Sequence, residues 1–472
     1  MGCIGQLFPK LTIHALPENV LLEIFKFYLD EASEVDDFPE DAWHDLVHVC
    51  QRWRCVVFAS PHRLDLQILC TNQNKVAKKL DIWPQLPIAL DMFLDTLQPS
   101  DLNNITAALK YHHRVRRINI YCVPNSVLKA FGAMKNPFPA LTEMTLESNA
   151  PYPQVLPDSF LLGSAPRLQT LTLRGISFPA LPKLFLSTSD LVELYLDHVP
   201  PSGYVSPEAL AAGLSMLPRL KKLSLLNQSP PSWDDSPRPP RFTRGVLPSL
   251  TFFEFHGHSQ YLERIVSWIE GPLLDDAWIK FSDQLAFDAP QLRHFFSRTE
   301  TFKAPHRADM LFSKDNVSVA LFWRNGIVDQ QKLHLTIPCS RSSWQISAIT
   351  HVCSSPLPPL PTLQRLGIYQ SESWKPEWQD NIVNTLWLQL FQPFSSVKNL
   401  FLSKKLVQLV APALQELTGG RVADVLPALQ NIFLHDPEPS DAVKEAMGQF
   451  IAERQLSDCP VAVHLERGLN FW

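Results

Sequence analysis

The sequence predicts an α/β protein in which a small bundle of three helices precedes an irregular solenoid with parallel strands. Apolar residues recur at helical spacing near the start of the chain, and a short leucine pattern then recurs almost to its end. Apolar residues also make up 45% of the 472 residues, which is enough for a packed interior. A chain of this length holds two or three domains, or one domain followed by a repeat array.

Residues 15–29, ALPENVLLEIFKFYL, predict the first helix. Pro17 suits a first helical position, where its missing N–H costs nothing, and Glu18 in the first turn favours the helix dipole. A one-sided apolar stripe at three- and four-residue spacing consists of Val20, Leu21, Ile24, Phe25 and Tyr28. Because further apolar residues lie on the other faces, this helix has more hydrophobic surface than one buried side requires.

A second amphipathic pattern follows an acidic, loop-like segment. In residues 42–60, AWHDLVHVCQRWRCVVFAS, apolar side chains again fall on helical spacing, and Pro61 ends the run. The alternating RLDLQIL after it predicts a short strand. We place this first domain at residues 11–70. A unit this small cannot bury all of its apolar surface alone, so the surplus either packs against the rest of the chain or forms a partner-binding groove.

This segment resembles an F-box, particularly the form common in fungal proteins. The resemblance covers residues 14–69 and is specific because several separate features occur in order at workable spacing. These features are Leu16-Pro17, Ile24-Phe25, Val49-Cys50, Trp53-Arg54 and the closing LDLQI. The acidic segment from Glu31 to Ala42 is longer than in a minimal F-box.

The F-box resemblance implies that the module binds the small Skp adaptor of a cullin-RING ubiquitin ligase. Binding would use the Leu-Pro turn and the apolar faces of the helices. The residues implied in the first contact are Leu16, Pro17, Val20, Leu21, Ile24 and Phe25. The residues implied in the second contact are Val49, Cys50 and Trp53, although Trp53 equally suits a core position.

Residues 71–472 carry a recurring pattern, L-x-x-L-x-L, often preceded by Pro. Its last two apolar residues lie two apart, as neighbours on one face of a short strand, and Pro before the first one ends the preceding helix. Weaker copies begin at Val115, Leu292 and Leu333. The clear copies have their apolar positions at Leu141, Met144 and Leu146; Leu168, Leu171 and Leu173; Leu191, Leu194 and Leu196; Leu220, Leu223 and Leu225; Leu250, Phe253 and Phe255; Leu363, Leu366 and Ile368; Val397, Leu400 and Leu402; and Leu429, Ile432 and Leu434.

The recurring pattern resembles a degenerate leucine-rich repeat. From Val115, the first positions of successive copies are 26, 27, 23, 29 and 30 residues apart, which fits or narrowly exceeds the range of such repeats. The Asn or Cys expected after the strand is replaced by Ile176, Val199 and Gln228. Stretches that can be helical lie between the copies, so stacked strand-then-helix units predict a parallel sheet on the concave side of an irregular solenoid.

Two elements are expected near the end of the array. Residues 440–455, SDAVKEAMGQFIAERQ, predict a helix with Ser440 as its N-cap, and PVAVHL predicts a short strand after it. Together they would shield the final repeat from solvent. APALQEL at 411–417 mimics the repeat, but Gly419 falls where an apolar residue is needed, so we expect helix there.

The sequence contains none of the motifs G-x-S-x-G, H-E-x-x-H, G-x-x-x-x-G-K-[ST] and G-x-G-x-x-G, which mark hydrolase, metalloprotease and nucleotide-binding sites. We therefore expect no enzymatic activity and no cofactor. The eight cysteines form no C-x-x-C pair, and His and Cys do not cluster at metal-ligand spacing, so we expect no metal. The net charge of −5 argues against a nucleic-acid partner. A hydrolase with an unrecognised site would instead need perturbed titratable groups in a deep pocket.

The sequence shows no clear signal for membrane targeting. No apolar run approaches a membrane span, and MGCIGQLFPK lacks the apolar core of a signal peptide, so we expect a cytoplasmic or nuclear protein without a membrane partner. Gly2 and Cys3 allow a lipidation interpretation, but Gln6 stands where Ser or Thr is expected. A frayed tail is the simpler interpretation.

Two stretches suggest contacts to a substrate, because binding energy concentrates in Trp and Arg anchors. SWKPEWQD places Trp374 and Trp378 beside charge on an expected loop, and the Pro-rich insert 230–245 contains Trp233. The alternative is that each Trp folds back to cap its own loop.

Taken with the F-box resemblance, these features predict a two-part recognition protein. It would be the substrate-recognition subunit of a Skp–cullin–F-box type E3 ubiquitin ligase, with a protein substrate on the repeats. The alternative is a non-catalytic leucine-rich-repeat scaffold without ligase association, whose first helices merely cap the array.

Overall fold

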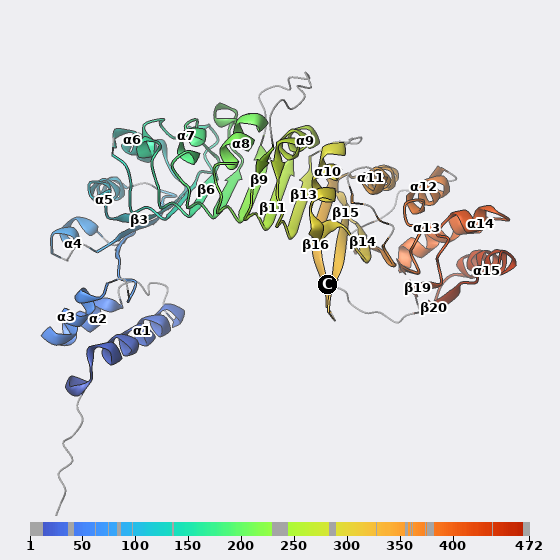
Figure 1. The fold of residues 1–472 in the computed structure, drawn as a ribbon, viewed down its shortest axis with the longest axis horizontal. Helices are drawn as coiled ribbons and strands as arrows, with labels where there is room; N and C mark the ends of the chain where they lie inside the picture. Colours follow the sequence, from blue (N-terminus) through green and yellow to red (C-terminus); the bar gives the residue numbers. More distant parts are fainter. Residues whose placement is uncertain are drawn as a thin grey trace, which may run out of the picture. The chain divides into compact units, whose positions relative to one another are not determined.

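The computed structural model describes most of the chain and divides it into two units, residues 1–170 and 171–472, each described by itself (Figure 1). Both units mix helices and strands, as the sequence predicts. The described residues are 13–35, 42–61, 63–73, 75–82, 86–96, 98–134, 136–228, 244–282, 289–326, 328–354, 357–358, 360, 362–372, 374, 382–436 and 438–465.

Unit 1 begins with the helices α1 (Glu18–Val35), α2 (Trp43–Val49) and α3 (Gln51–Ala59). Cys50 separates α2 from α3 because its backbone is extended, and its Sγ accepts a hydrogen bond from the amide of Trp53 at 3.5 Å. The side chains that these helices bury form a small apolar core of Leu21, Leu22, Phe25, Trp43, Leu46, Val47, Val56 and Val57.

The rest of unit 1 is built from strand-then-helix repeats. Its four longer strands pair in parallel and in chain order: β1 (Ile68–Cys70), β2 (Ile88–Phe93), β3 (Val115–Tyr121) and β4 (Glu143–Glu147). Figure 1 shows α5 and α6 on one side of these strands. The intervening helices are α4 (Val76–Ile82), α5 (Pro99–Leu109) and α6 (Asn125–Ala133), followed after β4 by the short strand β5 (Gln154–Val155) and the 3₁₀ turn Phe160–Gly163.

Unit 2 continues the repeat as a larger sheet. Its strands lie in the order β6-β8-β9-β11-β13-β16-β15-β14-β17-β18-β19-β20. Their bounds are β6 (Thr170–Arg174), β8 (Glu193–Asp197), β9 (Lys222–Gln228), β11 (Phe252–Gly257), β13 (Asp276–Phe281), β14 (Arg307–Phe312), β15 (Asn316–Asn325), β16 (Val328–Pro338), β17 (Arg365–Gln370), β18 (Asn399–Ser403), β19 (Asn431–His435) and β20 (Ala462–Leu465), with the two-residue strands β7 (Ile176–Ser177), β10 (Gly245–Val246) and β12 (Ile269–Glu270) outside this sheet order.

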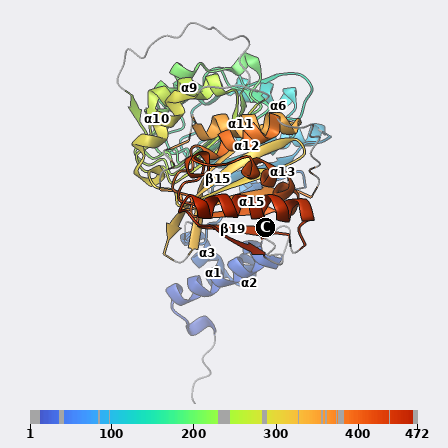
Figure 2. The same ribbon diagram turned by 90° about the vertical axis from the view of Figure 1, so that its right-hand side faces the viewer.

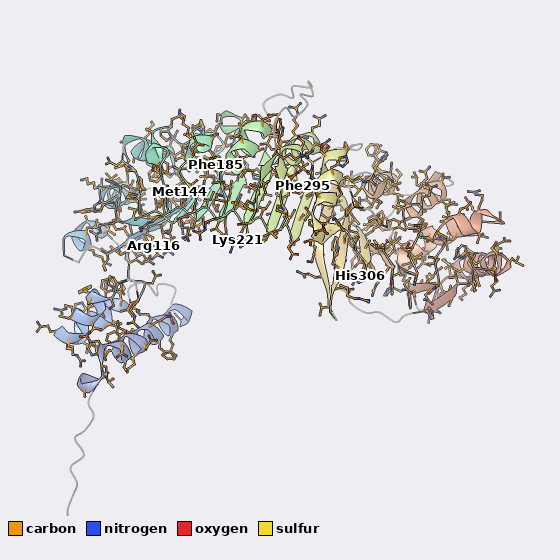
Figure 3. All side chains as sticks on the ribbon, in the orientation of Figure 1. Arg116, Met144, Phe185, Lys221, Phe295 and His306 are labelled. Atoms are coloured by element: carbon orange, nitrogen blue, oxygen red, sulfur yellow. The ribbon has the colours of Figure 1, made fainter. Side chains whose placement is uncertain are left out.

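The helices of unit 2 cover one face of its sheet. Phe185 of α7 and Phe295 of α10 are buried in the interior between helix and strand (Figure 3). α15 packs on α13 near the end of the unit (Figure 2). The helices are α7 (Leu181–Phe185), α8 (Pro207–Leu214), α9 (Ser259–Trp268), α10 (Pro290–Arg298), α11 (Ser342–Ser354), α12 (Ile382–Phe391), α13 (Lys404–Gln415), α14 (Arg421–Asp424) and α15 (Asp441–Leu456), and the 3₁₀ turns are Pro201–Gly203 and Glu300–Phe302.

The predicted leucine pattern is confirmed as the strand signal of the repeats. In every clear copy the three apolar positions are buried, and the last two lie on a strand. The backbone that leaves β6, β8 and β9 turns through a left-handed residue, at Gly175, His198 and Asn227 with φ of 66°, 48° and 51°. These turns stand near the place where a regular leucine-rich repeat would carry its Asn or Cys.

Two parts of the strand prediction were wrong or incomplete. Leu292 and Phe295 were expected on a weak strand copy, but they lie on α10, where helical spacing buries both against the sheet. The sequence pattern did not predict β13, β15 or the hairpin that joins β15 to β16, although the weak copy at Leu333 and Leu335 does lie on β16, where both residues are buried. β15 pairs antiparallel with both β14 and β16, while β16 pairs in parallel with β13 and β14 with β17.

The expected end of the array is confirmed. Ser440 caps α15, because its side chain accepts a hydrogen bond from the Val443 amide at 3.4 Å. β20 follows and pairs in parallel with β19. Residues 411–417, expected to be helical, lie largely in α13.

Candidate binding surfaces

Apolar side chains remain exposed on the first helix of unit 1. Val20 and Ile24 are 38% and 41% exposed, and Phe27 and Tyr28 on the same side are exposed as well. Val49, at the end of α2, is 58% exposed. We call Val20, Ile24, Phe27 and Tyr28 the α1 stripe. The described part of the chain covers this stripe only in part.

Two residues implied in the first adaptor contact, Leu21 and Phe25, are instead fully buried. The ring of Phe25 lies 4.7 Å from that of Trp53, which is half-buried. They face the small core because they lie about 100° and 140° around the helix from Val20, beyond the exposed side. Leu21 and Phe25 therefore support the surface from the core. On α1, the residues left for the implied adaptor contact are Val20 and Ile24.

The Leu16-Pro17 turn is tied to α3. The guanidinium of Arg52 donates a hydrogen bond to the carbonyl of Leu16, which itself is partly exposed, while Pro17 is exposed. Arg54 donates to the carbonyl of Val47 at 3.0 Å, which fixes the end of α2. Cys50 and Trp53 are both half-buried. The turn, α1 and the α2–α3 junction thus form one supported surface.

A second surface is the face of the sheet in unit 2 that its helices leave open. Register aligns alternate residues of successive strands there, as in the row Tyr195, Ser224, Glu254 and Trp278. We call it the helix-free face of unit 2. A solenoid of this kind offers an extended surface typical of protein-interaction scaffolds.

Aromatic rings gather on the helix-free face around Trp278. The exposed indole lies 6.4 Å from the ring of Phe252 and 6.1 Å from that of His334, and it donates to Asp276 Oδ1 at 2.9 Å. Burial raises the pKa of Asp276 to about 6 and lowers the pKa of His334. Sequence reasoning missed Asp276 and Trp278 because DAWIKF lacks the leucine pattern, although its alternation of apolar residues signals a strand.

A polar cluster links three strands at one edge of this face. Asp197 is buried and accepts hydrogen bonds from Arg174 Nε at 2.9 Å and from Asn227 Nδ2 at 3.0 Å. Burial opposes the charge of Asp197, but the hydrogen bonds from Asn227 and Arg174 and the nearby His198 outweigh it and lower the pKa of its carboxyl. The cluster therefore ties the turns after β6, β8 and β9 together.

Rings also stack along the last strands. Phe401 and Phe433 lie 4.4 Å apart with their planes at 7°, and Phe433 and His464 lie 4.8 Å apart. The guanidinium of Arg365 lies 4.0 Å from the centre of the Phe401 ring. This ladder stiffens β17 to β20, because aromatic pairs between neighbouring strands stabilise a sheet.

The expected substrate-contact tryptophans are not exposed anchors where the structure describes them. Trp374 is buried; its indole donates to Gln345 Oε1 at 3.0 Å, and its carbonyl accepts from Lys405 Nζ at 3.2 Å. The expectation of an exposed contact at Trp374 is therefore wrong, and the side chain instead packs inward beside Phe312. Trp233 and Trp378 lie outside the described residues.

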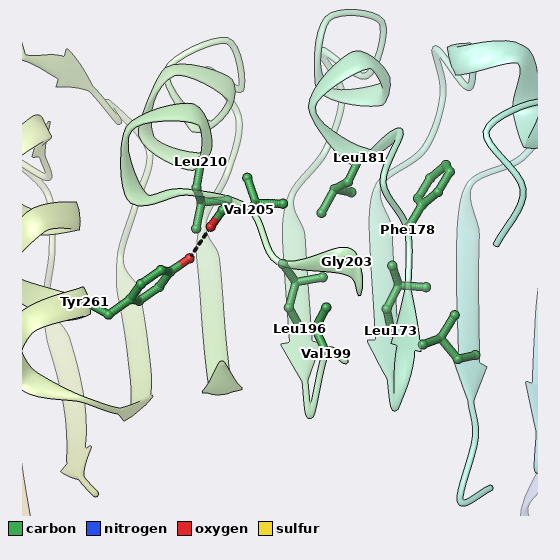
Figure 4. Close-up of a pocket in the computed structure, with 10 residues that line it drawn as sticks. Leu173, Phe178, Leu181, Leu196, Val199, Gly203, Val205, Leu210 and Tyr261 are labelled. Atoms are coloured by element: carbon green, nitrogen blue, oxygen red, sulfur yellow. Dashed lines mark hydrogen bonds between the residues drawn. The ribbon is translucent and has the colours of Figure 1, made fainter. Parts of the chain in front are cut away.

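One small cavity lies between the repeats of β6, β8 and α8 (Figure 4). Its wall is apolar, and Tyr261 closes it by donating to the carbonyl of Val205 at 2.9 Å. It has room for about one water molecule. The cavity is a packing gap between successive repeats.

The described residues contain no group of three or more His, Cys, Asp or Glu side chains arranged to hold a metal ion. Among the thiols, burial raises the pKa of Cys70 to about 12, and burial also raises the pKa of Cys353. Both are therefore neutral thiols at neutral pH. Within the described part of the chain, no helix is both long and apolar enough to cross a bilayer.

Comparison with known proteins gives little beyond this geometry. No family model matches the chain, and no curated protein matches it. One solved structure that it matches is that of the leucine-rich repeat-containing protein LegL7 from Legionella pneumophila, with 11% identity over 82% of this chain and 97% of that chain and a TM-score of 0.27. Because this likeness is distant, the description of the repeats rests on their own strands and helices.

Proposed function

We propose that the chain is the substrate-recognition subunit of a Skp–cullin–F-box type E3 ubiquitin ligase. In this proposal α1, α2 and α3 form an F-box that docks the Skp adaptor, and the repeats hold a protein substrate. The observation that carries the proposal is the α1 stripe together with Val49. These apolar side chains are exposed on a unit whose sequence resembles an F-box.

The size of the exposed surface supports a docking role. Complete burial of an aliphatic side chain is worth about 1.5–3 kcal/mol. Val20, Ile24 and Val49 are partly covered already, so a partner that covered them would gain on the order of 1 kcal/mol from each. The exposed ion pair between Arg63 and Glu23, at 3.2 Å, adjoins Ile24 along α1. An apolar centre with a polar rim is the usual composition of a protein interface.

In this role the chain would carry out no chemistry itself. It would hold a substrate near the ubiquitin donor and so raise the effective concentration of the substrate there. Two linked binding modules produce this effect without any additional contact. The helix-free face of unit 2 supports substrate binding because Trp278 and Phe252 supply aromatic anchors there.

The test is co-purification of the full chain with a Skp adaptor. Ile24→Asp or Val49→Asp places a charge in the proposed contact, and each should reduce the retained adaptor about tenfold or more. Phe25→Asp is unsuitable because it would unfold the unit from inside. Asn19→Asp is the matched control: it adds the same charge to an exposed position of α1, about 140° around the helix from Ile24, and should retain the adaptor.

The outcomes separate the two functions that the sequence leaves open. Equal retention by the wild type and by both aspartate variants would contradict the proposed contact. A wild-type chain that binds no adaptor, yet binds a protein through its repeats, would favour the non-catalytic scaffold without ligase association. Circular dichroism of each variant checks that the helices are intact.

A further inference from the structure

The helix-free face of β2, β3 and β4 in unit 1 is rich in carboxylates. Register places Asp91 of β2 beside Asn119 of β3, and Glu143 and Glu147 lie on the same face of β4. Burial raises the pKa of Asp91; the charge of Arg117 and the hydrogen bond with Asn119 oppose this shift, and the charge of Glu143 adds to it. Three carboxylates face one guanidinium on these strands.

The centre of this face carries an unused hydrogen-bond acceptor. Asn119 is 7% exposed, and its Nδ2 donates to Glu143 Oε1 at 3.0 Å. Its Oδ1 is buried and has no hydrogen-bond partner within the part of the chain that the structure describes. The acidic neighbours on both sides fix the amide with its NH₂ toward them, since carboxylates only accept. A buried acceptor without a donor is unfavourable, and a donor supplied by a partner would relieve that cost.

Two aromatic rings stand at the end of the same strands. Phe93 is 58% exposed, and its ring lies 6.4 Å from that of Tyr121. Asn72 holds the backbone of Phe93 on both sides, because its Oδ1 accepts from the Phe93 amide and its Nδ2 donates to the Phe93 carbonyl, each at 3.0 Å. The backbone that carries the exposed phenyl is therefore held in place. Burial, and then the negative charge of Asp91 and the two glutamates, raises the pKa of Tyr121.

We propose that this face, defined by Asp91, Phe93, Asn119, Tyr121, Glu143 and Glu147, binds an arginine- or lysine-bearing segment of a protein partner. Its polar groups are mainly acceptors and its charge is mainly negative, whereas a guanidinium or ammonium offers only donors and a positive charge. The rings of Phe93 and Tyr121 add faces on which a cation can lie. The inference rests on the proposed function only in taking the repeats as the partner-binding part.

Other ligand classes fit this face less well. A nucleic acid presents phosphates, which these carboxylates would repel. Within the described residues, Asp91, Glu143 and Glu147 are not arranged as a metal-binding group. A basic peptide satisfies the charge, the unused acceptor of Asn119 and the exposed ring of Phe93 together.

The experiment pans a library of displayed random peptides against the full-length chain. We expect enrichment of sequences that contain Arg or Lys. An enriched peptide should bind the double variant with Glu143→Gln and Glu147→Gln about tenfold more weakly than it binds the wild type. The matched control is Glu208→Gln with Glu445→Gln, which removes the same charge from exposed positions of the helices α8 and α15 and should bind as the wild type does. Replacement of the peptide's arginines by citrulline, which keeps their shape and removes their charge, should weaken binding equally.

Two results would overturn the proposal: no enrichment of basic peptides, or an enriched basic peptide that binds the Glu143 and Glu147 variant as tightly as the wild type. Should that variant fold poorly, binding of the enriched peptide to the wild type between about 0.05 and 0.5 M salt decides, since affinity that does not fall with salt contradicts a charged contact. Adaptor co-purification is measured separately. Loss of adaptor binding by the wild type would refute the ligase role and leave the peptide result unaffected.

Discussion

The ring of Phe25 lies 4.7 Å from the ring of Trp53, with their planes inclined at 57°, inside the helical unit formed by α1, α2 and α3. Two positions further along α1, Phe27 is 70% exposed. The same residue type therefore serves the core at one position and the surface at the other.

This contrast predicts unequal effects of the same truncation. Phe25→Ala should destabilise the helical unit by about 3–5 kcal/mol, because it removes a buried ring and leaves a cavity beside Trp53. Phe27→Ala should change stability by less than about 0.5 kcal/mol. Hydrogen exchange of the amides in α1 and α3 measures both. Equal protection in the two variants would show that Phe25 is not part of the core.

The buried carboxylate of Asp197 predicts a stability contribution that is lost in acid. Its folded-state pKa lies below the ordinary value, so the unfolded chain binds the proton more readily. The contribution is present above a pH of about 4 and is lost as pH falls through the folded-state pKa. Asp197→Asn should therefore lower the melting temperature at neutral pH, and its deficit against the wild type should shrink near pH 3. A deficit that does not depend on pH would show that the charge is irrelevant.

Asp276 predicts the opposite sign. Burial raises its folded-state pKa to about 6, so the folded protein holds the proton more tightly than the unfolded chain does. Stability that the protonated form contributes is lost as pH rises from about 4 through 6. Asp276→Asn keeps an oxygen that accepts from Trp278 Nε1 and removes the charge. The melting temperature of the variant minus that of the wild type should be larger at pH 8 than at pH 4. A variant that is more stable than the wild type only at pH 4 would contradict the predicted direction of the pH dependence.

Arg454 of α15 holds the last repeats through backbone carbonyls. It is fully buried and donates to the carbonyls of Cys459, Val422 and Leu429 at 3.0 Å and of Leu426 at 3.4 Å. Arg454→Leu leaves these acceptors unpaired and should cost on the order of 3 kcal/mol or more in urea unfolding.

Two further variants define this effect. Arg454→Lys keeps the charge but cannot place donors on so many carbonyls, so it should restore only part of the loss. Arg421→Leu removes an exposed arginine of α14 and should stay within about 0.5 kcal/mol of the wild type. Full stability of Arg454→Lys would show that charge, rather than the fork of donors, is what the site needs.

The strands of the repeats were predictable because one local rule specifies them. Leu220, Leu223 and Leu225 are buried for the same reason in each clear copy: an entry turn and two inward positions on a strand require apolar residues at fixed spacing. β13 follows only the weaker alternation of DAWIKF. β15 carries no copy of the pattern, whereas Leu333 and Leu335 of β16 form a weak one. Leu292 and Phe295 suit either a strand or a helix, since a short apolar run does not decide between them.

The candidate surfaces were only partly predictable. Spacing on α1 identifies a helix with excess apolar surface, but which side meets α3 depends on the packing of Phe25 against Trp53, which lies far along the chain. The polar neighbours of Trp374 left open whether its side chain is exposed or folds back. Its burial depends on Gln345, whose position comes from a distant helix. The face around Asn119 arises from strand register, which joins residues more than twenty positions apart.

The antiparallel hairpin of β15 and β16 has a consequence for how unit 2 folds. Parallel neighbours such as β17 and β18 meet only after a long crossover, whereas Asn325 and Val328 pair across a tight turn. The closure entropy of the hairpin is therefore small, and hairpins form in microseconds. We expect this segment to order early and to serve as the template on which β13 and β14 add from opposite sides, so that the array grows from its middle outward.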